Sequence, residues 1–177
     1  DATPFDWFRD GRMLSLHGAI DDASGIVTGL YLCENECLNG YLETMRQCVL
    51  THGVPQSIYS DNHTIFRSPK TGRLTVEEII AGKTVNLTQF GRAMHEMGTD
   101  IIFAKTSWAK GRIERLWDTL QSRLPVEFAR RGIKTIEAAN QFLLEEYLNK
   151  YNRKFSVKPK GESIFVPLRS DIDIDTI

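Results

Sequence analysis

Apolar and polar residues along the chain recur at two different periods, and the change of period separates predicted strands from predicted helices. Residues 13–20 and 26–33 are strand-like runs, and the polar segment 21–25 between them is typical of a hairpin turn. Residues 1–8 form an earlier run of the same kind, followed by an Asp-Gly turn. The pattern therefore predicts an antiparallel meander of three strands.

A helical period follows the third run. Apolar residues recur three and four positions apart over 38–49, Asn35 can cap this helix, and Gly53 fits its C-terminal end. Residues 56–60 then predict a fourth strand. Because a strand, a helix and a second strand in this order favour parallel pairing, we expect the fourth strand to run parallel to a neighbour in the sheet.

The rest of the chain predicts one more strand and three helices around an irregular insertion. The insertion spans about 66–88 and holds a short helix near 76–81. The remaining elements, in chain order, are a helix from Thr88 to Met97 that Gly98 ends, a fifth strand over 100–104, a long helix from about 113 that Pro125 should kink or end, a last helix over 135–151 that Thr135 caps, and an extended tail from 156.

This order of elements predicts an α/β fold with a five-stranded mixed sheet and helices on both of its faces. We expect a core over residues 1–131, which includes the insertion. Residues 132–177 should add a C-terminal helix and a tail that pack on the core or mediate assembly.

The bulk composition fits one domain of ordinary globular type. The 177 residues are enough to bury a core, and 41% of them are apolar and 25% charged. No apolar run approaches the roughly 20 residues that span a bilayer, so we expect no membrane partner. The chain begins without Met on an acidic residue inside a strand-like run, and we expect it to be a domain excised from a longer protein.

The three cysteines, Cys33, Cys37 and Cys48, are a sparse and odd-numbered set. Cys33 and Cys37 have neither a histidine nor a second cysteine pair at zinc spacing. We therefore expect reduced thiols in a cytosolic protein rather than a Cys33–Cys37 redox pair, for which no motif is present.

The distribution of charge is more informative than the total. The net charge of −1 argues against a protein that grips nucleic acid by charge alone. Residues 105–131, however, hold seven Lys and Arg against three Asp and Glu. This positive excess lies where a phosphate backbone would run if Glu114 is catalytic. From charge alone, a solvated helix face is the better explanation.

Three acidic residues, Asp1, Asp61 and Glu114, occupy positions from which one fold could gather them. Asp1 lies in the first strand-like run, Asp61 follows the fourth, and Glu114 opens the long helix. Carboxylates repel one another, so a cluster of three requires a cation, and hard oxygen ligands favour Mg²⁺ or Mn²⁺. Each residue also has a structural alternative. Asp1 could be a frayed chain end, in which case Asp6 is the competing candidate for the acidic residue of the first strand. Asp61 could cap its loop together with Asn62, and Glu114 could be a first-turn residue that the helix dipole favours.

Four segments carry a resemblance to a known family: residues 1–3, 19–25, 53–62 and 110–115. In this order they resemble the catalytic cores of DDE transposases and retroviral integrases, and most closely those of bacterial insertion-sequence transposases. The resemblance covers the chain up to about Leu124 and implies a ribonuclease-H-like fold. It further implies that the three carboxylates are a catalytic triad that holds two Mg²⁺ or Mn²⁺ ions during DNA strand cleavage and strand transfer.

The resemblance also implies partners and further site residues. The active protein would be a homo-oligomer that acts on transposon ends and target DNA in the bacterial cytoplasm, associated with the nucleoid. The residues expected to contact DNA are Lys105, Lys110, Arg112 and Arg115. Asn62 and His63 are expected to lie near the site.

The chain departs from the family pattern at three places. His63 stands where the family usually has Gly, the segment between Asp61 and Glu114 is longer than in the retroviral enzymes, and Asp118 stands where those enzymes have a DNA-contacting Lys. Two other functions stay open beside the transposase hypothesis. They are another ribonuclease-H-like nuclease, and a non-catalytic module for DNA binding or oligomerisation.

Overall fold

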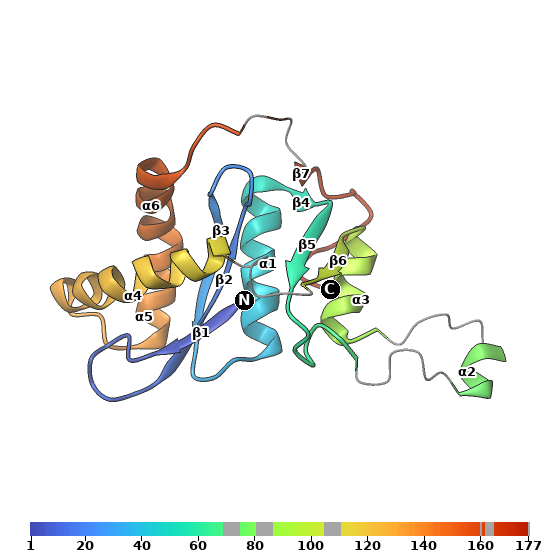
Figure 1. Cartoon of the computed structure of the whole chain (residues 1–177), viewed down its shortest axis with the longest axis horizontal. Coiled ribbons are helices and arrows are strands. Elements are labelled where there is room, and N and C mark those ends of the chain that lie inside the picture. Colours follow the sequence, from blue (N-terminus) through green and yellow to red (C-terminus); the bar gives the residue numbers. More distant parts are fainter. Residues whose placement is uncertain (69–74, 81–86, 105–110, 160, 162–164, 177) are drawn as a thin grey trace.

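The computed structural model of the chain describes residues 1–68, 75–80, 87–104, 111–159, 161 and 165–176, which form a mixed α/β fold (Figure 1). In Figure 1 the first three strands lie between one long helix and a group of helices from the C-terminal half of the chain. None of the helices in the described ranges combines the length and the apolar character that crossing a bilayer requires.

The strands at the start of the chain form an antiparallel sheet in the order β1 (Ala2–Phe5), β2 (Leu14–Ile20) and β3 (Val27–Cys33). The predicted meander is therefore confirmed, although the first strand ends three residues early. The reason is the turn that follows it. The two carboxylate oxygens of Asp6 accept the backbone N–H groups of Asp10 and Gly11, each at 3.1 Å.

Alternation along β2 gives this sheet two different faces. Leu14 and Leu16 point to one face, and Ser15 and His17 point to the other. The first face packs against the C-terminal helices, which are α4 (Gly111–Arg131), α5 (Ile136–Phe142) and α6 (Leu148–Phe155). The second face packs against α1 (Leu38–His52) so closely that a Cβ atom on Gly40 would overlap the His17 ring.

Helix α1 confirms the predicted helix but not its predicted cap. It begins after Cys37, whose side chain makes no capping bond, so the prediction that Asn35 caps the helix is wrong. The Cys37 backbone N–H instead donates to Nε2 of His17 at 3.1 Å. Gly53 ends the helix with a φ of 103°, a conformation that favours glycine, as predicted.

Two short strands, β5 (Ser57–Ser60) and β6 (Asp100–Phe103), pair in parallel, as expected of the fourth and fifth strands. Helix α3 (Gln89–Met97) precedes β6, and the Gly91 N–H donates to Oγ1 of Thr88 at 2.9 Å, which confirms the predicted cap. The short helix α2 (Val76–Ile80) lies within the predicted insertion, whose segments 69–74 and 81–86 are outside the described residues.

Backbone ladders among the described residues divide the strands into three sheets instead of the single five-stranded sheet that the pattern predicts. They are β1-β2-β3, β5-β6, and a third pair in which β4 (Val54–Pro55) meets β7 (Phe165–Val166) antiparallel. Alternating residue types determine which face of a strand is buried. They do not determine which strand lies at its edge, so the sequence pattern could not separate the sheets.

Helix α4 continues through Pro125, so of the two predicted outcomes, a kink or an end, the end is wrong. A proline inside a helix removes one N–H donor and crowds the carbonyl group four residues earlier. Pro125 is buried between Leu124 and Phe128, and this packing offsets the lost hydrogen bond. Thr135 caps α5 as predicted, and a π-helical turn, η2 (Leu143–Tyr147), joins α5 to α6.

Buried side chains form two core clusters. The first core cluster lies between the β1–β3 sheet and the C-terminal helices, and its members include Trp7, Leu16, Trp117, Leu120, Leu124, Phe128 and Leu143. The second core cluster lies around α1 and α3, and its members include Tyr41, Met45, Phe66, Phe90, Met94 and Met97.

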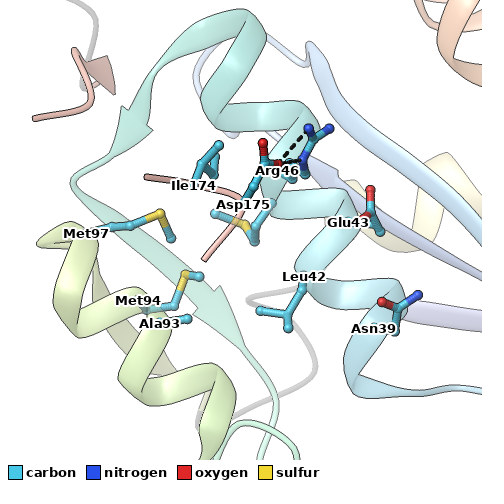
Figure 2. A pocket seen from close by; sticks show the side chains of 10 residues that line it. Asn39, Leu42, Glu43, Arg46, Ala93, Met94, Met97, Ile174 and Asp175 are labelled. Atoms are coloured by element: carbon cyan, nitrogen blue, oxygen red, sulfur yellow. Dashed lines mark hydrogen bonds and ion pairs between the residues drawn. The ribbon is translucent and has the colours of Figure 1, made fainter. Parts of the chain in front are cut away.

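The C-terminal segment lies against the second core cluster. Figure 2 shows Ile174 and Asp175 between α1 and α3, where they help to line a groove of about 180 Å³. Nη2 of Arg46 lies 2.8 Å from Oδ1 of Asp175. Together with the β4–β7 pair, these contacts fasten the tail to the fold.

Candidate functional site

Asp1 is held in place at the edge of the first sheet. Its backbone nitrogen donates to the Gly18 carbonyl oxygen at 3.1 Å, and the Gly18 N–H donates back to the Asp1 carbonyl oxygen at 2.9 Å. Its carboxylate Oδ2 lies 3.5 Å from Nε1 of Trp117, at the long limit for a hydrogen bond. Asp1 therefore lies beside α4. Its competitor Asp6 uses both carboxylate oxygens to hold the turn after β1.

Glu114 is exposed in the first turn of α4. Trp117 and Gln121 follow it by three and seven positions, so the three side chains share one face of the helix. Gln121 donates through Nε2 to Oγ1 of Thr3 at 3.2 Å, and the Trp117 ring packs over Gly18. Two contacts thus turn this face of α4 toward the beginning of β1, where Asp1 lies.

Asp61 follows β5 directly and is half-buried. Its Oδ1 accepts the His63 backbone N–H at 2.9 Å, the loop-capping arrangement that the sequence left open as an alternative. The negative charge of Asp61 also acts on Tyr41 of α1. Burial raises the pKa of the Tyr41 hydroxyl, and the carboxylates of Glu36 and Asp61 raise it further.

Tyr41 of α1 packs against the first sheet at His17. Its ring packs edge-on against the His17 ring, with 4.8 Å between centroids. His17 pairs with Ala2 across the β1–β2 ladder, and Ala2 is the residue next to Asp1. Ala2 therefore lies on the face of the first sheet that packs against α1, whereas Asp1 directs its carboxylate toward Trp117 of α4.

The three carboxylates do not form a tight cluster. In the part of the chain that the structure describes, the oxygens of the three carboxylates are not all within 4.8 Å of one another. The possible ligand atoms of His17, Cys33 and Cys37 do lie within this distance of one another. A site made of Asp1, Asp61 and Glu114 would offer only carboxylate oxygens, which are ligands that a hard divalent cation such as Mg²⁺ or Mn²⁺ prefers.

The predicted DNA-contacting and near-site residues have varied surroundings. Nε of Arg112 lies 2.7 Å from Oδ1 of Asp22 in the β2–β3 hairpin, and Arg115 is exposed on α4. Asn62 accepts a hydrogen bond from Arg67, and Nδ1 of His63 accepts the Ile65 N–H at 3.3 Å. Lys105 and Lys110 lie outside the described residues.

The group of His17, Cys33 and Cys37 is one that the sequence spacing did not reveal. His17 is buried, and burial lowers its pKa, so the ring is neutral at pH 7. Its Nδ1 lies 3.2 Å from the Tyr31 carbonyl oxygen, and its Nε2 accepts the Cys37 N–H. Because both ring nitrogens are engaged, the ring joins β2, β3 and α1 in a structural role.

All three cysteines are free thiols, consistent with the expectation of reduced cysteines. Burial raises the pKa of the Cys33 thiol to about 12 and that of the Cys48 thiol to about 11. Both therefore remain protonated at neutral pH and are weak nucleophiles. The β2–β3 register pairs Ser15 with Cys33 and so brings Cys33, at the end of β3, close to His17. Only the tertiary structure brings these two residues together.

Comparison with known proteins places this arrangement in context. No protein-family model matches the chain. It is 40% identical over 160 residues to the transposase for insertion sequence IS1202 of Streptococcus pneumoniae, a match that covers 90% of this chain and 33% of the relative. It is 35% identical over 170 residues to y4bF of Sinorhizobium fredii, whose name provisionally calls it a transposase; this match covers 95% of the chain and 35% of the relative.

Over most of its own length, the chain is therefore a relative of bacterial insertion-sequence transposases. It spans about a third of the length of the curated relatives that it matches.

Proposed function

We propose that the chain carries the catalytic core of an insertion-sequence transposase of the DDE type, with Asp1, Asp61 and Glu114 as its acidic triad. The observation that supports this best is the contact between Asp1 and Trp117, which brings the first strand to the helix face that bears Glu114. The relatives named as transposases support the same class of activity.

A ribonuclease-H-like arrangement is part of this proposal. The main elements β1, β2, β3, α1, β5, α3, β6 and α4 come in the order typical of such a fold, and the short elements β4 and α2 are inserted between them. Ala2 of β1 and Ile58 of β5 both pack against the second core cluster. Their shared environment supports a sheet in which β5 lies beside β1, with Asp1 and Asp61 as neighbours.

In this proposal the carboxylates hold and orient the reacting groups. Asp1 and Asp61 would bind one divalent ion together, and Glu114 would bind a second. When bound, the ions supply Lewis-acid stabilisation of the attacking and leaving oxygens at phosphorus. Arg112 and Arg115, in the first turns of α4, would offset charge that develops on the phosphate. The nucleophile would be water in donor cleavage and a DNA 3′-hydroxyl in strand transfer.

The partners proposed with this function are transposon-end DNA, target DNA and further copies of the protein. Transfer of one DNA end to another requires both DNA partners in one complex, and the homo-oligomer would supply it. The expected location is the bacterial cytoplasm, at the nucleoid.

Replacement of one carboxylate by its amide tests the proposal. Glu114→Gln should lower Mn²⁺-dependent cleavage and strand transfer by about 10³-fold, because the amide is a much poorer ligand for a hard cation. Asp118→Asn, one turn further along the same helix, is the matched control and should retain activity. Unchanged activity of Glu114→Gln would refute the assignment, and a preference for RNA–DNA hybrids would indicate a different ribonuclease-H-like nuclease.

A further inference from the structure

A second positively charged surface lies about two turns further along α4 than Glu114. A groove of about 370 Å³ runs between α4 and the helical segment formed by η2 and α6. Its lining includes three basic residues and three aromatic residues, namely Arg123, Lys150, Lys154, Tyr147, Tyr151 and Phe155. None of these residues belongs to the predicted DNA contacts.

Positive charge exceeds negative charge in this groove. Glu127 is its acidic member, and Nζ of Lys150 lies 3.0 Å from Oε1 of Glu127. Arg131 binds the other oxygen of the same carboxylate, so Glu127 is already shared by two cations. Among the described residues, no carboxylate forms an ion pair with Arg123 or Lys154, and both side chains are exposed.

Aromatic rings position these two cations. Tyr147, Tyr151 and Phe155 follow one another at intervals of four residues along one helix face. The guanidinium carbon of Arg123 lies 5.1 Å from the centre of the Phe155 ring, and Nζ of Lys154 lies 5.5 Å from it. Cation–π contacts of this kind hold flexible side chains at the rim of the groove and reduce the entropy lost when a ligand binds.

The groove also continues from the candidate site. Arg115, Thr119 and Arg123 are four residues apart on α4 and form one stripe along the helix. Arg115 and Arg123 are separated by about 12 Å at a rise of 1.5 Å per residue. Measured along the axis of B-DNA, this length corresponds to about three to four base-pair steps, at a rise of about 3.4 Å per phosphate of one strand.

We propose that the groove between α4 and α6 is a docking surface for the phosphate backbone of duplex DNA, with Arg123 and Lys154 as its main contacts. This inference rests on the proposed function and extends it from the reacting phosphate to the flanking duplex. Phosphate is the expected ligand because the groove presents two cations, while the aromatic ring beside them is already in contact with these cations and is not available to stack on a base. The Phe155 ring is occupied by Arg123 and Lys154 and therefore serves to position them.

Salt-dependent binding by the 177-residue chain tests the inference. Duplex DNA binding would be followed by fluorescence anisotropy between 50 and 200 mM NaCl, without a divalent ion, for the double variant Arg123→Gln/Lys154→Gln. Loss of two phosphate contacts should reduce the slope of log K against log salt by about 1.8, since each contact contributes about 0.9. The control Arg9→Gln/Arg92→Gln removes two exposed positive charges outside the groove and should leave the slope unchanged.

A third variant, Phe155→Leu, should weaken binding several-fold while the salt slope stays near that of the parent, because both cations remain but lose their common support. Equal losses of slope in the two double variants, or a parent chain that binds no duplex, would overturn the inference. Cleavage by Glu114→Gln decides the proposed function separately. An inactive Glu114→Gln variant together with a groove variant that binds like the parent would refute the groove and keep the transposase.

Discussion

The two core clusters differ in how they are closed. The first core cluster is covered by long helices, and its wholly buried side chains include Trp7, Phe128 and Leu143. The second core cluster contains three methionines and short strands, and part of its boundary is the C-terminal tail at Ile174 (Figure 2). Helices that pack over many residues give one side a tight core, whereas the other side depends on shorter elements and a fastened tail.

The candidate triad spans this difference. Asp1 contacts Trp117 of the first core cluster, and Glu114 lies on the same helix as Trp117. The charge of Asp61 acts on Tyr41, a member of the second core cluster. The position of Asp61 relative to the other two carboxylates therefore depends on the contact between the two sides, which can be tested separately from the chemistry.

The largest expected effect comes from truncation of each core. Phe128→Ala should lower the free energy of unfolding by about 4 kcal/mol, and Met94→Ala by about 3 kcal/mol, because each leaves a cavity at a fully buried position. Urea denaturation measures both. Val126→Ala, at a position that is 40% exposed on α4, should change the value by less than about 0.5 kcal/mol. A larger loss for Met94→Ala than for Phe128→Ala would contradict the difference in packing.

The next effect concerns the contact between α1 and the first sheet. Gly40→Ala should cost about 1–3 kcal/mol, because the added Cβ overlaps a His17 ring whose two nitrogens are both engaged. Gly111→Ala is the matched control, since nothing lies within 4 Å of its added Cβ. Thermal unfolding of the two variants compares them, and equal midpoints would show that His17 can move aside.

A smaller effect should appear as a pH dependence. Burial holds the pKa of His17 below its ordinary value of 6.5, so the unfolded chain takes up the proton first as pH falls. Stability should be fully present above that value and decline below it, by no more than about 1.4 kcal/mol per pH unit for this group.

Denaturation between pH 7.5 and 5.5 measures this slope, which His17→Gln should reduce. Burial also lowers the pKa of His52, so the pH slope of the His52→Gln variant is compared with that of His17→Gln. If the His17 variant kept the parent's slope, the acid sensitivity would arise elsewhere.

The smallest effect compares two helix caps, one on each side of the molecule. Thr88 caps α3 beside the second core cluster, and Thr135 caps α5 beside the first. Each Thr→Ala change should cost about 1 kcal/mol through loss of one capping hydrogen bond. Thr119→Ala, whose hydroxyl donates to the carbonyl four residues earlier inside α4, should cost only a few tenths. A cap effect no larger than this control would show that tertiary packing alone holds the helix end.

Local signals in the sequence predicted most elements of the fold. Alternation predicted β1, β2 and β3, helical spacing predicted α1 and α3, and the threonine and glycine signals predicted the ends of α3. These features depend on residues a few positions apart, so a single sequence contains the necessary information. The same sequence also indicated Asp1, Asp61 and Glu114 as a set, and their joint role stays a prediction.

Other features depend on contacts between distant segments, and only the tertiary structure decided them. Pro125 stays inside α4 because burial offsets its missing hydrogen bond, and β4 finds its partner in a tail more than a hundred residues away. His17 replaces the expected Asn35 at the start of α1 because the β1–β3 sheet presents its ring there. The sequence alone determined what each segment can form. The choice of partner required the packed fold, because edge pairing, burial and ring contacts depend on which surfaces meet.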